Sequence, residues 1–145
     1  PVFSDAPDAD VVKHPKIYFF DGGVLNGLYS NFEASTDRIG ALFEGFIFQQ
    51  IRNSAMALDK DFKIEYFRTR HGLEVDFIVH LNRKVWAIEV KAGHVSQADL
   101  SGLRGFRGYY PGVHRCIAVT PKEHPRNVDG ILVCDWKHLL RELGL

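Results

Sequence analysis

Two acidic residues and one lysine on neighbouring predicted strands are the residues of this sequence best suited to chemistry. Asp76 lies in one apolar run, and Glu89 and Lys91 lie in the next. If these runs form a hairpin with a symmetric loop at Asn82 and Arg83, residues whose numbers sum to 165 face one another. Asp76 is then predicted to face Glu89, and like charges about 5 Å apart destabilise a sheet. A divalent cation between the two carboxylates would remove this conflict.

The same register assigns the two faces of the hairpin. The pairs predicted for the apolar face are Val75 with Val90, Phe77 with Ile88, and Val79 with Trp86. On the polar face, Glu74 is predicted to pair with Lys91 as an ordinary cross-strand ion pair worth about 0.2 to 1 kcal/mol. Ile78 and Ala87 continue this second face as apolar residues, so the carboxylates are not expected to be simply solvated.

The predicted chemistry is metal-dependent hydrolysis of a phosphodiester. Mg²⁺ takes oxygen ligands from one or two carboxylates, keeps several waters and leaves positions open for a phosphate. The predicted ligands of the cofactor, Mg²⁺ or Mn²⁺, are Asp76, Glu89, the backbone carbonyl of Val90, and Glu44 through a water. Lys91 lies on the same strand face as Glu89, where a cation stabilises charge on the phosphate or holds the attacking water. Each acid alone is more simply interpreted as a solvated residue, and it is the combination that favours a site.

A helix that precedes the strands is needed to bring Glu44 to this site. Apolar residues at the spacing of an amphipathic helix predict a helix over residues 36–58, with Ser35 or Thr36 as its cap. Glu44 lies at the border of the apolar stripe, on the same ridge as Phe48. Its carboxylate is therefore expected to start among bulky apolar neighbours.

The remaining chain predicts an α/β domain. Three strands in close order form an antiparallel meander, a helix follows, and two further strands and a closing helix complete the chain. The predicted strands are residues 63–70, 73–80, 84–91, 115–120 and 131–134, and the predicted later helices are residues 96–110 and 135–143. Residues 1–15 are predicted to be an irregular lead-in. Order is expected to begin at Lys16, with a β-prone run over residues 17–20 that a turn at residues 21–23 ends.

These residues resemble the signature of a known superfamily. Asp76, the triplet Glu89-Val90-Lys91 after twelve intervening residues, and Glu44 on the preceding helix are similar to the PD-(D/E)XK pattern of the restriction-endonuclease-like nucleases. Four segments also resemble an uncharacterised domain family that lies C-terminal to the ATPase module of many bacterial and archaeal AAA-type ATPases. They are KIYFFDGGVL at residues 16–25, GALFEGF at 40–46, YFRTRHGLEVDF at 66–77 and IEVKAG at 88–93.

The resemblance implies a restriction-endonuclease-like α-β-β-β-α-β core, with a central mixed sheet flanked by helices, over residues 16–145. The site residues that it implies are two metal ligands, Asp76 and Glu89, a catalytic lysine, Lys91, and an accessory acid, Glu44. Val75 stands where the superfamily often has proline, at a position that varies widely. The resemblance also implies an ATPase module upstream of Pro1 in a longer chain, which agrees with the absence of a phosphate-binding G-x-x-x-x-G-K-[ST] motif.

Composition and charge limit the partners. The 145 residues include 18 Lys and Arg and 18 Asp and Glu, so charge-driven coating of DNA is excluded and contact with DNA needs a local arrangement of charge. The arginines predicted to contact nucleic acid are Arg68, Arg70, Arg104 and Arg107. No spacing of histidines or cysteines is typical of a zinc site, and Cys116 and Cys134 are predicted to be buried thiols. No window approaches the ~20 apolar residues of a membrane span and the first residues lack a signal-peptide pattern, so a cytoplasmic location is expected.

Two functions remain open at this point. The first is a Mg²⁺- or Mn²⁺-dependent DNA phosphodiesterase domain attached to an AAA-type ATPase. The second keeps the fold without catalysis, as a module that docks DNA or regulates the ATPase through a closed ion-pair cluster of Glu74, Asp76, Glu89 and Lys91. The predicted partners are DNA, the upstream ATPase and a second copy of the chain, and no membrane partner is expected.

Overall fold

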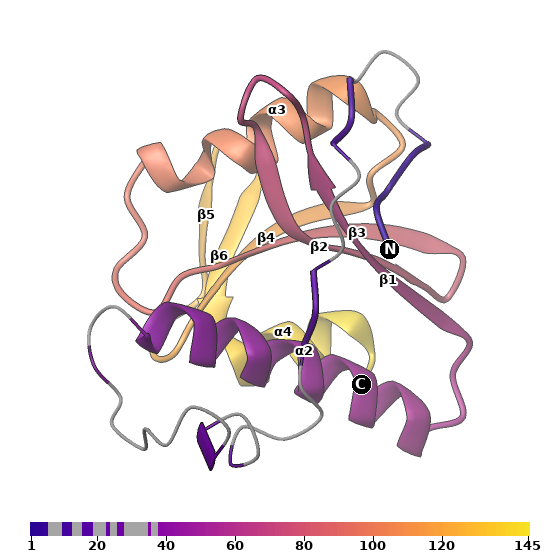
Figure 1. Ribbon diagram of the computed structural model, residues 1–145, viewed down its shortest axis with the longest axis vertical. Helices are drawn as coiled ribbons and strands as arrows, with labels where there is room; N and C mark the ends of the chain where they lie inside the picture. Colours follow the sequence, from indigo (N-terminus) through magenta and orange to yellow (C-terminus); the bar gives the residue numbers. More distant parts are fainter. Residues whose placement is uncertain (6–9, 13–15, 19–22, 24–25, 28–34, 36–37) are drawn as a thin grey trace.

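The computed structural model has an α/β fold in which helices cover both faces of one mixed sheet (Figure 1). It describes residues 1–5, 10–12, 16–18, 23, 26–27, 35 and 38–145. The elements in chain order are α2 (Ile39–Ala57), β1 (Phe62–Arg68), β2 (Glu74–Leu81), β3 (Lys84–Val90), the 3-10 turn η1 (Ala98–Leu100), α3 (Ser101–Tyr109), β4 (Arg115–Thr120), β5 (Arg126–Val128), β6 (Ile131–Asp135) and α4 (Trp136–Leu143). The predicted α-β-β-β-α-β order is confirmed.

The six strands lie in the order β1-β2-β3-β4-β6-β5. Strands β1, β2 and β3 are antiparallel, as the predicted meander requires, whereas β4 runs parallel to both β3 and β6. Strand β5 closes the far edge antiparallel to β6 and was not predicted. Its three residues are too few to show the alternation that identifies a strand.

Each face of the sheet has its own apolar core. Helices α2 and α4 lie on one face and α3 lies on the other (Figure 1). In the α2 core, Ile51 of α2 is buried with Phe77 and Ile88 of the sheet. In the α3 core, Phe106 of α3 is buried with Ile78. The two cysteines are buried, one in each core, as predicted: Cys116 and Cys134.

Helix α2 begins at Ile39, three residues after its predicted start. The backbone carbonyl of Ser35 accepts hydrogen bonds from the N–H groups of Arg38 and Ile39 at 3.0 and 2.9 Å, and no side chain among the described residues caps the helix at Arg38. The predicted side-chain cap at Ser35 is therefore wrong, because the helix starts too far along the chain for it. Thr36, and residues 19–22 of the predicted β-prone run and turn, lie outside the described residues.

The β2–β3 hairpin has the predicted register over most of its length. The predicted pairs that form are Phe77 with Ile88, Ile78 with Ala87, and Val79 with Trp86. Asn82 and Arg83 have φ angles of 53° and 61°, as a two-residue type I′ loop requires. The ladder ends at the first of those pairs, so three predicted pairs do not form: Asp76 with Glu89, Val75 with Val90, and Glu74 with Lys91.

A bulge in β2 explains where this ladder ends. Two residues of β2, Asp76 and Phe77, face the single residue Tyr66 of β1, because the pairs on either side are offset by one position. The extra residue reverses the alternation of the strand, so Val75 packs in the α3 core and Phe77 packs in the α2 core. The predicted continuous apolar face through Val75 is therefore wrong.

Candidate functional site

The bulge places Asp76 where β2 and β3 separate. The backbone N–H of Val90 donates a hydrogen bond to Oδ2 of Asp76 at 2.9 Å. The carboxylate thus serves as the partner of a backbone donor just beyond the end of the ladder. The Asp76 side chain is only 13% exposed. Burial, and then the charge of Glu44, raise the pKa of Asp76, although Lys16 and the Val90 N–H act against this shift.

Glu89 contributes the most buried carboxylate of the site. The residue is 9% exposed, and the Lys91 ammonium lies 3.0 Å from its Oε1 atom. Its Oε2 atom is buried and has no hydrogen-bond partner in the part of the chain that the structure describes. Burial, and then the charge of Asp76, raise the pKa of Glu89 to about 7. A buried oxygen of this kind has its lone pairs free for a ligand.

Helix α3 approaches these carboxylates closely because residue 102 is glycine. A Cβ atom at Gly102 would lie 2.1 Å from the backbone oxygen of Glu74 and 3.8 Å from Oε2 of Glu89. A distance of 2.1 Å is far shorter than a van der Waals contact, so no residue with a Cβ atom fits at position 102. The glycine therefore allows the backbone of α3 to pack directly on the start of β2, beside the site.

Lys91 follows the end of β3 and lies between two acids. Its ammonium is 3.0 Å from Oε1 of Glu89 and 3.8 Å from Oδ1 of Asp99, and not in the predicted pair with Glu74. Asp99 also accepts the backbone N–H of Ser96 at 2.9 Å, as the acidic residue of a capping box does. Burial would lower the pKa of Lys91, but the hydrogen bond and charge of Glu89 outweigh it and raise the pKa. Lys91 is therefore a stable cation.

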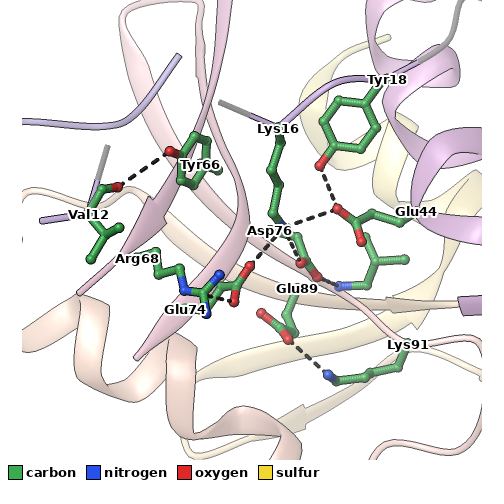
Figure 2. Close-up of polar contacts among 11 residues, drawn as sticks. Val12, Lys16, Tyr18, Glu44, Tyr66, Arg68, Glu74, Asp76, Glu89 and Lys91 are labelled. Atoms are coloured by element: carbon green, nitrogen blue, oxygen red, sulfur yellow. Dashed lines mark hydrogen bonds and ion pairs between the residues drawn. The ribbon is translucent and has the colours of Figure 1, made fainter. Parts of the chain in front are cut away.

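Lys16 lies among three carboxylates, an arrangement that sequence reasoning missed. Its ammonium is 2.9 Å from Glu74, 3.2 Å from Glu44 and 3.3 Å from Asp76 (Figure 2). The hydroxyl of Tyr18 donates to the same Glu44 oxygen at 2.5 Å. Burial would lower the pKa of Lys16, but Asp76 and Glu74 raise it above its ordinary value. The two-residue spacing of Lys16 and Tyr18 was a signal that they share one side of an extended segment.

Four residues of the predicted site line one pocket: Glu44, Asp76, Glu89 and Lys91. Val90, the predicted backbone ligand, is not among its lining residues. The pocket has a volume of about 620 Å³, and its walls come from α2, β2, β3, η1, α3, the segments next to β2 and β3, and Lys16. The charged residues that line it are Lys16, Glu44, Glu74, Asp76, Glu89, Lys91 and Asp99. Glu44 reaches this pocket from α2 and Glu89 reaches it from β3, so the pocket lies at the end of the hairpin where the two strands have separated.

The four predicted nucleic-acid arginines do not line this pocket. Arg104 pairs with Asp129 at 2.7 Å, and Arg107 donates to the backbone oxygens of Asp129 and Gly130. Both therefore hold α3 to the turn between β5 and β6. The other two are more exposed: Arg70 lies 3.3 Å from Asp10, and Arg68 lies 3.8 Å from Glu74. Arg68 is the one that reaches a residue of the pocket wall.

The described residues contain neither a metal-binding cluster of three or more side chains nor a membrane-spanning helix. No group of three or more His, Cys, Asp and Glu side chains there is arranged to hold a metal ion. Lysines instead lie among the carboxylates: Lys16 contacts Glu44, Glu74 and Asp76, and Lys91 contacts Glu89 and Asp99. Likewise, none of the helices described is long and apolar enough to cross a membrane.

Comparison with known proteins places the chain in a family. The family model described as "Domain of unknown function (DUF4143)" matches residues 39–139, which is more than half of the chain. The match includes Glu44, Asp76, Glu89 and Lys91 but not Lys16. No curated protein matches the sequence. The chain belongs to the DUF4143 family of domains of unknown function.

Proposed function

We propose that this domain is a metal-dependent DNA phosphodiesterase of the restriction-endonuclease-like, PD-(D/E)XK type. The observation that carries the proposal is the buried Oε2 atom of Glu89, which has no hydrogen-bond partner in the described part of the chain and lies in the same pocket as Asp76 and Lys91. A buried carboxylate oxygen without a donor costs free energy, and a cation is the ligand that would remove this cost. The α-β-β-β-α-β order of the fold supports the same class.

The carboxylate oxygens of the pocket are the kind of ligand that a small hard cation prefers. Mg²⁺ needs only one or two carboxylates and keeps several waters, so the absence of a three-residue cluster from the described residues is compatible with it. Asp76 and Glu89 would hold Mg²⁺ or Mn²⁺, with the backbone carbonyl of Val90 as a further ligand and Glu44 acting through a water. Such an ion supplies polarisation of a phosphate oxygen and activation of a water.

The residues of the chain would perform the remaining steps. Lys91, a cation next to Glu89, stabilises negative charge that develops on the phosphate and orients the attacking water. The hydrogen bond from Val90 fixes the orientation of Asp76 in advance, which lowers the cost of binding. With 18 basic and 18 acidic residues, the domain has no net charge to attract DNA from a distance. An ATPase module in the same chain, or a second copy of the domain, is the proposed means of bringing it to DNA.

Plasmid cleavage tests this function. Wild-type protein with Mg²⁺ or Mn²⁺ should convert supercoiled plasmid to nicked or linear DNA, and Lys91→Ala should reduce the rate by about 10²- to 10³-fold. Lys84→Ala is the matched control, because Lys84 is an exposed lysine at the other end of the same strand, and it should cleave at the wild-type rate. Cleavage that persists in Lys91→Ala would come from a contaminating nuclease and would refute the proposal.

A second function also has an observation in its favour. The Lys16 ammonium already neutralises part of the charge of Glu44, Glu74 and Asp76, as expected of a nuclease-fold module that docks DNA or regulates the ATPase without catalysis. Calorimetric titration with Mn²⁺ separates the two functions. Binding that is lost in Asp76→Asn favours the phosphodiesterase, whereas no binding, or binding that Asp76→Asn leaves unchanged, favours the docking module.

A further inference from the structure

Lys16 and a metal ion would need the same oxygen atoms. The Lys16 ammonium lies 3.3 Å from Oδ1 of Asp76, the oxygen that the Val90 N–H does not occupy. The same ammonium contacts Glu44 of α2 at 3.2 Å, so it lies between Asp76 and Glu44 (Figure 2). Two cations this close together repel strongly in a half-buried site. The ammonium and a divalent ion therefore exclude one another.

We propose that Lys16 is a built-in counterion that a divalent cation displaces from Asp76, so that metal binding and the docking of Lys16 compete. This inference rests on the proposed metal site. In the metal-free protein, Lys16 holds Asp76, Glu44 and Glu74 together, although their charges repel one another. On metal binding, the ammonium leaves Asp76 and becomes exposed to solvent.

The contacts of the neighbouring residues allow this movement to be local. The ring of Tyr18 stacks on Phe48 of α2 with a distance of 4.6 Å between ring centroids, and its hydroxyl donates to Glu44. Ile17, which lies between Lys16 and Tyr18 in the sequence, is 82% exposed and has little apolar contact to lose. Tyr18 thus anchors the segment to α2, while the flexible side chain of Lys16 swings between the acids and solvent.

Calorimetric titration with Mn²⁺ measures the competition. Lys16→Met keeps the apolar stem of the side chain and removes the charge, and it should lower the Mn²⁺ dissociation constant by about 5- to 150-fold, the usual range for two coupled ligands. Lys16→Arg keeps a cation and should bind Mn²⁺ more weakly than Lys16→Met. Lys60→Met, at an exposed lysine after α2, is the control and should bind as the wild type does.

The outcomes separate this inference from the proposed function. Equal Mn²⁺ affinity in wild type and Lys16→Met, with binding still dependent on Asp76, refutes the counterion role and leaves the metal site intact. Binding only in Lys16→Met supports the counterion role in its strongest form. No binding in either protein refutes the metal site and the displacement together.

A second measurement uses the unmodified protein, in case Lys16→Met folds poorly. Brief labelling with acetic anhydride, read by mass spectrometry at each lysine, reports how accessible each amine is. Addition of Mn²⁺ should make Lys16 label several-fold faster and leave Lys60 unchanged, because displacement exposes the Lys16 amine. A Lys16 labelling rate that Mn²⁺ does not change, at a concentration that saturates the site, would overturn the proposal.

Discussion

The two ends of the β2–β3 hairpin differ in almost every physical property. At the turn end, Leu81 pairs with Lys84 in a regular ladder that continues inward over apolar residues. At the other end the ladder stops, a bulge shifts the strand, and the Asp76 carboxylate accepts a hydrogen bond from the backbone of β3. The comparison shows that regular pairing provides the stability of the hairpin, whereas its interruption provides the polar pocket.

The largest expected effect concerns the turn end. Leu81 is 2% exposed, and Leu81→Ala leaves a cavity in the α2 core. We expect the free energy of unfolding to fall by about 2 to 5 kcal/mol, as measured by urea denaturation. Met56→Ala, at a 55% exposed side chain of α2, is the control and should change the free energy by less than about 0.5 kcal/mol. Equal losses in the two variants would contradict the view that apolar burial stabilises the turn end.

The next effect concerns the site end and its dependence on pH. The pKa of Glu89 is raised from 4.5 to about 7 in the folded protein, so folding is favoured while Glu89 keeps its proton. This contribution is present below pH 4.5 and is lost as pH rises through 7. Glu89→Gln cannot ionise, so in EDTA it should exceed the wild type in free energy of unfolding at pH 8 by up to about 3 kcal/mol, with a much smaller difference at pH 5.

Urea denaturation of both proteins at the two pH values checks this sign. Other titrating groups are common to wild type and variant. The pH-dependent change in the difference between the two proteins therefore belongs mainly to Glu89 and to Asp76, whose charge raises the pKa of Glu89. A wild type that gains stability relative to Glu89→Gln between pH 5 and pH 8 would show that the Glu89 carboxylate is not buried without a compensating partner.

The smallest effect concerns the helix that covers the site end. Gly102→Ala puts a methyl group 2.1 Å from the backbone oxygen of Glu74, so α3 must shift, and we expect a loss of about 1 to 3 kcal/mol. Gly108→Ala in the same helix meets nothing within 4 Å and should stabilise the protein by about 0.5 to 1 kcal/mol. Thermal unfolding of the two variants gives the comparison, and shifts of the same sign would contradict the close approach at residue 102.

Much of the fold could be predicted because its signals are local. The symmetric loop at Asn82 and Arg83 fixed the register of the hairpin, and the apolar alternation that follows it agreed with that register. The strand Arg115–Thr120 was predicted with its bounds, because it is a continuous apolar run between a turn and a loop. The predicted helix over residues 135–143 forms as α4, and the side chain of Asp135 caps it by accepting the N–H of His138.

The parts that could not be predicted depend on contacts between distant residues. The bulge at Asp76 and Phe77 appears only when β1 is laid beside β2, because the sequence of β2 has apolar residues at every second position, as in a strand without a bulge. Lys16 contacts Asp76 across 60 residues of sequence, which no spacing rule reveals. Arg104 and Arg107 were predicted to contact DNA because the sequence does not show that both contact Asp129, in the turn between β5 and β6.

The hydrogen bond between Asp76 and Val90 has a consequence for the evolution of such domains. Through this bond Asp76 connects β2 to β3 where the ladder has ended. That structural role persists whether or not the domain hydrolyses a substrate. Glu89 differs, since its buried Oε2 atom has no hydrogen-bond partner among the described residues and therefore costs the folded state free energy. If the proposed hydrolysis is the activity of the family, a relative that has lost it would therefore gain stability by replacing Glu89 while keeping Asp76. Among relatives, the residue at position 89 should therefore distinguish domains with the proposed activity from domains without it better than the residue at position 76 does.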